Sequence, residues 1–201
     1  MAPLILASRV HAGWSMAWRV LAVAALMWLH HPQVAAAQEA SSEEAIAERR
    51  VKAAYLYRFA GYTEWPDDVF ARPDSPLVIG VWGNDELADD LAKLVAMRTV
   101  AGRHCEVRKI KEGDALAGVH LLFVARDRTA RAAEALSASP LRGLLVVTDS
   151  PGALRQGGAV NFLAMEGQIR FELSLEAAER RGLKLSSRLA AVSSNLAGKG
   201  R

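Results

Sequence analysis

The chain has 201 residues with 25 basic and 22 acidic side chains, and 51% of its residues are hydrophobic. This length can bury a hydrophobic core without disulfide bonds, and the single cysteine, Cys105, excludes an internal disulfide. Two basic residues, Arg9 and Arg19, fall in a predicted leader, which leaves 23 basic against 22 acidic residues. This balance removes the main support for a protein that binds nucleic acid or an anionic membrane.

Residues 1–37 have the order of features that is typical of a secretory signal peptide. A basic region precedes the apolar run 20–29, and the small residues Ala35–Ala37 form a cleavage site. The apolar run is too short to cross the roughly 30 Å hydrocarbon core of a bilayer as a helix. We therefore predict an exported protein with a cleaved signal peptide over 1–37 and a single domain over 38–201. The alternative is an uncleaved anchor.

A helix is predicted to begin near Ser41, because Ser41–Glu44 has the Ser-x-x-Glu pattern of a capping box. It should end near Gly61, ahead of Pro66. One apolar stripe and one charged face are expected along it. The stripe contains Ile46, Val51, Tyr55, Leu56, Phe59 and Tyr62, and the charged face contains Glu48, Arg49, Arg50, Lys52 and Arg58.

Strands and helices then alternate along the chain. Three of the strands are continuous apolar runs, which is typical of strands that are buried on both faces of a parallel sheet. The more polar strand 104–110 should lie towards an edge, with Cys105 as a buried apolar side chain rather than a reactive thiol. The predicted strands cover 76–82, 104–110, 119–125 and 143–148, and the predicted helices begin at Asn84 or Asp85 and at Arg126.

A β-hairpin is predicted around Glu166–Gly167, because Gly accepts the positive φ of a tight turn. Its register follows from the pattern, since a slip by one residue would mix the apolar and polar faces. The core face pairs Ala164 with Ile169, Phe162 with Phe171 and Val160 with Leu173, and the other face pairs Leu163 with Arg170 and Asn161 with Glu172.

Two short helices should follow the hairpin. Ser174 caps the first, over 175–181, Gly182 ends it, and Ser186 or Ser187 begins the second. The predicted fold is therefore α/β: a mostly parallel sheet with helices on both faces and a C-terminal antiparallel hairpin. This is a three-layer α/β/α sandwich of the Rossmann-like kind.

The sequence offers no catalytic apparatus. Outside the leader there are two histidines, His104 and His120, and neither belongs to a nucleophile or metal motif. The segment Gly80–Gly83 lacks the glycine pattern and the lysine of a phosphate loop, so we interpret it as the turn at a strand end. No catalytic residue, cofactor or metal is expected, and the protein is not expected to be an enzyme.

Several segments together resemble a known family. Residues 51–60, followed by Glu64-Trp65-Pro66, are similar to its opening helix, and 76–81 and 118–124 are similar to its strands. The C-terminal half resembles the family over 149–152, 156–162, 167–172 and 182–189. On these motifs the chain is identified as a member of the YfiR-like family of periplasmic regulators.

The resemblance implies a non-catalytic, dimeric regulator. It would bind the periplasmic portion of a membrane-bound diguanylate cyclase or sensor kinase and repress cyclic di-GMP signalling. Some members carry cysteine pairs that respond to redox state, and Cys105 alone departs from that pattern. The predicted partner contacts are Asn161, Leu163, Arg170, Glu172 and Arg188. The alternative function is a periplasmic small-molecule sensor that uses the strand ends near Gly83 and 149–152.

Overall fold

The computed structural model describes residues 31–138 and 141–197. The chain divides into two units, Met1–Ile46 and Ala47–Arg201, and helix α2 (His31–Gly61) runs from the first into the second. The predicted signal peptide lies outside the described residues up to residue 30. Within the described ranges, no helix combines the length and the apolarity that a bilayer span requires.

The second unit is built on a mixed β-sheet. Its strands are β2 (Leu77–Trp82), β3 (Thr99–Val100), β4 (Arg103–Ile110), β5 (Leu121–Val124), β6 (Leu145–Thr148), β7 (Val160–Met165), β8 (Gln168–Ser174) and β10 (Asn195–Ala197). They lie in the order β10-β8-β7-β6-β5-β2-β4-β3. Strands β4, β2, β5, β6 and β7 are mutually parallel. Strand β8 runs antiparallel to β7, and β3 runs antiparallel to β4.

The parallel strands follow the doubly wound order, in which strands are added first on one side of the starting strand and then on the other. From β2 the chain passes to β4 on one side and then to β5 on the other, so the reversal lies between β2 and β5. The predicted mostly parallel α/β sheet is confirmed. A separate small sheet pairs β1 (Thr63–Glu64) with β9 (Lys184–Leu185), and the sequence did not predict it.

Helices cover both faces of the main sheet. Phe59 of α2, Leu91 of α3 (Asp85–Val95) and Leu189 of α6 (Ser187–Ala191) belong to one hydrophobic cluster. Ala132 of α4 (Thr129–Ala138) belongs to a second cluster with Leu122 and Val146. Strand side chains alternate between these clusters, so the clusters lie on opposite faces. The remaining short helices are η1 (Asp67–Val69), η2 (Arg126–Arg128), η3 (Ala153–Gln156) and α5 (Leu175–Glu179).

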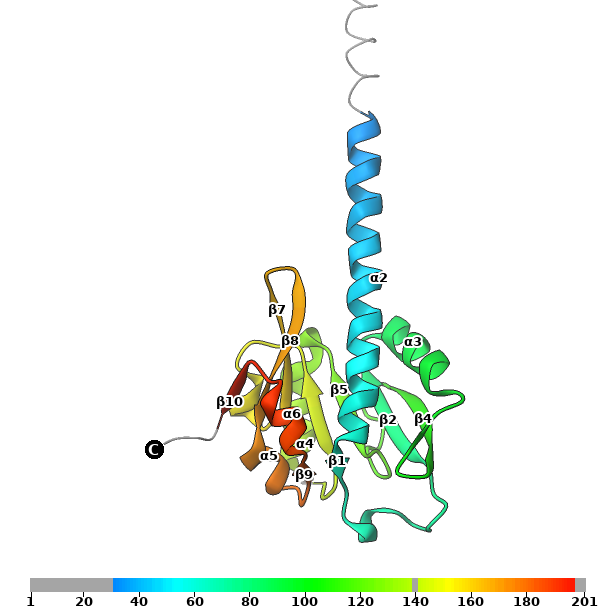
Figure 1. The fold of residues 1–201 in the computed structure, drawn as a ribbon, viewed down its shortest axis with the longest axis vertical. Helices are drawn as coiled ribbons and strands as arrows, with labels where there is room; N and C mark the ends of the chain where they lie inside the picture. Colours follow the sequence, from blue (N-terminus) through cyan, green and yellow to red (C-terminus); the bar gives the residue numbers. More distant parts are fainter. Residues whose placement is uncertain (1–30, 139–140, 198–201) are drawn as a thin grey trace, which may run out of the picture. The chain divides into compact units, whose positions relative to one another are not determined.

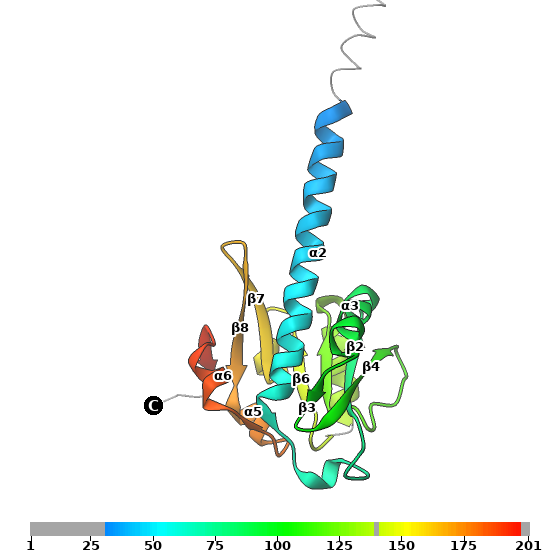
Figure 2. The ribbon, with the colours of Figure 1, turned by 45° about the vertical axis from the view of Figure 1, so that its right-hand side comes forward.

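Helices α2 and α3 lie side by side in both views (Figures 1 and 2). Arg49 of α2 joins them, because its guanidinium lies 2.7 Å from Glu86 and 3.4 Å from Asp90 of α3. Asn84 begins α3 by accepting a hydrogen bond from the Leu87 amide at 2.9 Å, as the N-cap prediction required.

The apolar stripe predicted for α2 is partly wrong. The buried face contains Ala53, Leu56, Phe59 and Ala60, together with Lys52, which was assigned to the charged side. Ile46, Val51 and Tyr62, which were assigned to the stripe, are 37%, 41% and 39% exposed. The buried face is shifted by about one residue from the predicted stripe and includes Lys52. Its two carboxylate partners offset the free-energy cost of burying its charge.

The predicted start of this helix at Ser41 is also wrong. Helix α2 already includes His31, and the Ser41 and Ser42 hydroxyls donate to the carbonyls of Gln38 and Glu39 within the helix. A Ser-x-x-Glu sequence caps a helix only where free amides exist. Here the preceding alanines, glutamine and glutamate are good helix formers, so the helix continues through them.

The β7–β8 hairpin has the predicted register in every pair. Phe162 lies opposite Phe171, Leu163 opposite Arg170, and Asn161 opposite Glu172. Glu166 and Gly167 at its turn have φ values of 52° and 72°, the left-handed pair that a two-residue hairpin turn requires. Figure 1 shows this turn past the ends of the other labelled strands.

Candidate functional site

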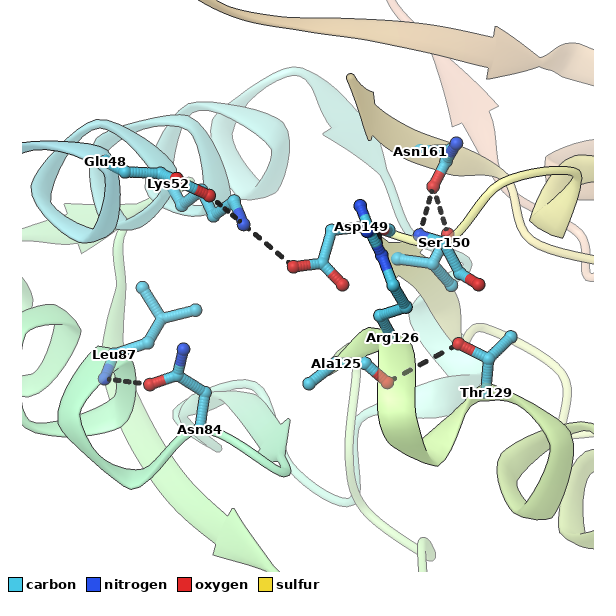
Figure 3. A network of polar contacts seen from close by, with 11 residues as sticks. Glu48, Lys52, Asn84, Leu87, Ala125, Arg126, Thr129, Asp149, Ser150 and Asn161 are labelled. Carbon is cyan, nitrogen blue, oxygen red and sulfur yellow. Dashed lines mark hydrogen bonds and ion pairs between the residues drawn. The ribbon is translucent and has the colours of Figure 1, made fainter. Parts of the chain in front are cut away.

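The candidate site is a polar network at the carboxyl ends of the parallel strands, and we call it the strand-end network (Figure 3). Sites in doubly wound sheets lie at this edge, next to the point where the strand order reverses. Its central residue is Asp149, which directly follows β6. The other members are Glu48 and Lys52 from α2, Arg126 after β5, and Asn161 on β7.

Lys52 forms an ion pair with Asp149 across the network. Its ammonium lies 2.8 Å from the Asp149 carboxylate and 2.6 Å from Glu48, and the residue is only 7% exposed. Burial by itself would lower the pKa of Lys52, but the hydrogen bonds to Asp149 and Glu48 outweigh it, so the pKa is raised. Lys52 therefore stays charged and ties α2 to the end of β6.

Arg126 places a second cation near Asp149. Its Nε donates to the Asp149 backbone carbonyl at 3.1 Å. One carboxylate oxygen of Asp149, Oδ1, is buried and accepts no hydrogen bond from the described residues. The network thus contains charges that neutralise one another, and no nucleophile is paired with a base within it.

The neighbouring turn at Gly83 does not have the open geometry of a phosphate loop. A Cβ built on Gly83 would lie 2.7 Å from Arg128 Cγ and 3.1 Å from Ala125 Cβ. The side chains of Arg128 and Ala125 therefore occupy the space beside Gly83. This agrees with the interpretation of Gly80–Gly83 as a strand-end turn.

Asn161 joins the strand-end network to the hairpin. Its Oδ1 accepts hydrogen bonds from Thr148 Oγ1 at 2.7 Å and from the Ser150 amide at 3.0 Å, and its Nδ2 donates to Glu172 at 2.9 Å. Asn161 is 0% exposed. It was predicted as a partner contact, and its burial corrects that prediction. The alternation of apolar and polar residues identified the hairpin face on which Asn161 lies, but not the turn at Ser150 that covers it.

The other predicted contact residues fall into two groups. Leu163 and Glu172 are half-buried and Arg170 is exposed, and all three lie on the same face of the hairpin. Arg188 is exposed on α6, whose Leu189 packs in the cluster that contains Phe162 and Phe171. Arg188 therefore lies on the opposite side of the sheet, and the structure does not bring it together with the other three.

The sequence missed the exposed apolar side chain at the hairpin turn and the central role of Lys52. Met165 is 45% exposed, next to the exposed Ala164. The only signal in the sequence for the role of Lys52 was its position among the apolar residues of the predicted stripe. Within the part of the chain that the structure describes, no group of three or more His, Cys, Asp or Glu side chains has the arrangement of a metal site.

His120 lies in the core and is 5% exposed. Its Nδ1 accepts a hydrogen bond from the Val78 amide at 3.1 Å, so the ring is neutral with its proton on Nε2. Phe70 stacks on the ring at 4.5 Å, and the Arg103 guanidinium lies 3.7 Å from the centre of the Phe70 ring. Burial lowers the pKa of His120 below 6.5; the nearby Val69 backbone opposes this and Arg103 adds to it.

This arrangement predicts a loss of stability at acidic pH. Below pH 6.5 the unfolded chain takes up a proton on His120 that the folded chain does not, so the free energy of unfolding should fall until the lowered folded-state pKa is passed. Urea unfolding between pH 7.5 and 5 measures this slope. His120→Asn should flatten it, whereas His104→Gln, which changes an exposed histidine, should not. Equal slopes in the His120→Asn variant and the unmodified protein would contradict the assignment.

The comparisons with known proteins agree with the motifs. A family model described as YfiR/HmsC-like matches residues 49–194, from within α2 to the segment before β10. A search among curated proteins found no match. The matched residues make up well over half of the chain and include each segment on which the resemblance was based, from Val51 to Leu189. The chain belongs to the YfiR/HmsC-like family.

Proposed function

We propose that this protein is a periplasmic, non-catalytic regulator that binds the periplasmic portion of a membrane-bound diguanylate cyclase and represses cyclic di-GMP signalling. The observation that carries the proposal is the YfiR/HmsC-like match over 49–194, since regulation of this kind characterises the family. The proposal includes export by the leader, its removal after Ala37, a single domain over 38–201, and a homodimer.

The mechanism is that the regulator binds one state of its partner more tightly than the other. A regulator shifts its partner between two states only by the difference between its binding free energies to those states. The proposed contact surface is the hairpin face formed by Leu163, Arg170 and Glu172. It combines an apolar side chain with both signs of charge, and the register of the two strands sets the positions of these side chains. Arg188 would then contribute a separate contact on the other side of the sheet.

The test is the cellular level of cyclic di-GMP. Deleting the gene should raise this level while the cyclase is expressed, and the unmodified gene should restore it. The variant Arg170→Glu should fail to restore it, because the reversed charge lies at the centre of the hairpin face. The matched control is Arg131→Glu, which reverses an exposed arginine on α4 that is paired with Glu112.

The outcomes separate the function from the surface. An unchanged cyclic di-GMP level after deletion would reject repression of a cyclase. If deletion raises the cyclic di-GMP level and both variants return it to its original value, repression is supported but the hairpin face is rejected as the contact surface. Recovery of each variant from the periplasmic fraction in equal amounts is the required control.

A further inference from the structure

A second site candidate lies away from the strand-end network, and we call it the arginine hollow. It is an open hollow of about 350 Å³, lined by Leu141, Arg142, Glu179, Arg180, Arg181 and Gly182. Two chain segments meet there: the turn that follows α5 and the residues that lead into β6. The Gly143 amide donates to the Arg181 carbonyl at 2.7 Å, and this bond fixes one segment against the other.

Gly182 lies beside the Arg142 side chain. Gly182 has a φ of 75°, and a Cβ built on it would lie 3.4 Å from Arg142 Nε and 3.5 Å from Pro66 Cγ. The Arg142 side chain therefore passes directly beside the backbone of the turn. Three guanidinium groups and a single carboxylate, that of the exposed Glu179, line the hollow.

Two of the three guanidinium groups have carboxylate partners outside the hollow. Arg180 pairs with Glu176 one helical turn earlier, and Arg142 lies 3.7 Å from Asp68. Arg181 differs. Among the residues that the structure describes it has no ion-pair partner, and its Nη1 is buried without a hydrogen-bond acceptor. Burial, and then the charge of Arg180, lower the pKa of Arg181, as expected for a cation that no anion compensates.

A half-buried guanidinium without a counter-charge is unfavourable, because its lost hydration is not replaced. An oxyanion in the hollow would supply the missing counter-charge. The planar guanidinium fork matches two oxygens of a phosphate or carboxylate, and such charge-assisted bonds are stronger than neutral ones. The hollow is large enough for a small ligand, and Leu141 supplies an apolar wall beside the charged groups.

We propose that the arginine hollow is a binding site for a small oxyanion, a phosphate or a carboxylate, with Arg181 as the main ligand and Arg142 as the second. This inference does not rest on the proposed repression of a cyclase, because the hollow shares no residue with the hairpin face. Anion binding in the arginine hollow would let a small molecule control a protein that belongs to a family of regulators.

The test uses inorganic phosphate and acetate as separate probes on the purified protein. Each is titrated at a constant ionic strength held with sodium chloride, and the thermal unfolding midpoint and the amide resonance of Gly182 are followed. One of the anions should raise the midpoint and move the Gly182 resonance. The anion that does so identifies phosphate or carboxylate as the ligand class. Arg181→Gln should weaken this binding by about tenfold or more, because it removes a charge-assisted hydrogen bond.

The controls keep the proposal open to rejection. Arg131→Gln, on an exposed arginine outside the hollow, should bind the anion as the unmodified protein does. Without anion, Arg181→Gln should be at least as stable as the unmodified protein, since it removes an uncompensated charge. If Arg181→Gln does not fold, Arg142→Gln takes its place and should weaken binding by a smaller factor. An equal effect of the anion on the unmodified protein and on the folded variant, or no effect beyond that of sodium chloride, would overturn the site.

Discussion

Replacing Phe59 by alanine should lower the free energy of unfolding by about 4 kcal/mol, because it opens a cavity at the contact between α2 and the hairpin. Phe59 is 0% exposed. Its ring centre lies 5.0 Å from that of Phe171 and 5.6 Å from that of Phe162, one from each hairpin strand. Urea unfolding of the variant at pH 7 measures the loss.

An exposed aromatic residue directly after the same helix shows what the loss of an unburied ring costs. Tyr62→Ala removes a ring that is 39% exposed and lies near the end of the helix, so it should cost much less. Phe59→Leu should recover part of the loss because it refills part of the cavity. Equal destabilisation by Phe59→Ala and Tyr62→Ala would show that the aromatic cluster does not hold the helix to the hairpin.

Replacing Lys52 by methionine should lower the free energy of unfolding by about 3 kcal/mol, because it leaves the Asp149 carboxylate partly buried without its cation. The side chains of Lys52 and Asp149 are 9% and 18% exposed, so solvent screens their interaction only weakly. The measurement is a double-mutant cycle by urea unfolding at pH 7, with Lys52→Met, Asp149→Leu and the double variant.

The cycle has a definite expected pattern. The double variant should be more stable than Lys52→Met, since it removes both charges rather than one. Lys109→Met is the control, because Lys109 pairs with Asp89 on the surface and its loss should have no measurable effect. A loss in the double variant equal to the sum of the two single losses would show that the two side chains act independently.

Much of the fold could be predicted from the sequence because its strands carry strong patterns. The hairpin is the clearest case: three apolar pairs and two mixed pairs allow a single register, and that register is observed. Strands β1 and β10 are two and three residues long, and they pair with β9 and β8, which are distant in sequence. No local pattern of that length could have indicated them.

The candidate site was less predictable, because its residues acquire their roles through distant partners. One of the two carboxylates that pair with the buried Lys52 comes from Asp149, far along the chain. Asn161 was correctly placed on the less apolar face of the hairpin, but the turn at Ser150 covers it. Arg188 was grouped with the hairpin residues because a sequence does not reveal over which face of the sheet a short C-terminal helix lies.

The reversal of strand order between β2 and β5 also has a kinetic consequence. β2 is an inner strand of the sheet, flanked by β4 and β5, and β5 comes last of the three in the chain. The middle of the sheet therefore cannot close until residue 124 is available, and closing a long loop makes folding slow. Until then an almost wholly apolar strand lacks one neighbour, and a nascent chain at this stage should be prone to aggregation and a good substrate for a holding chaperone.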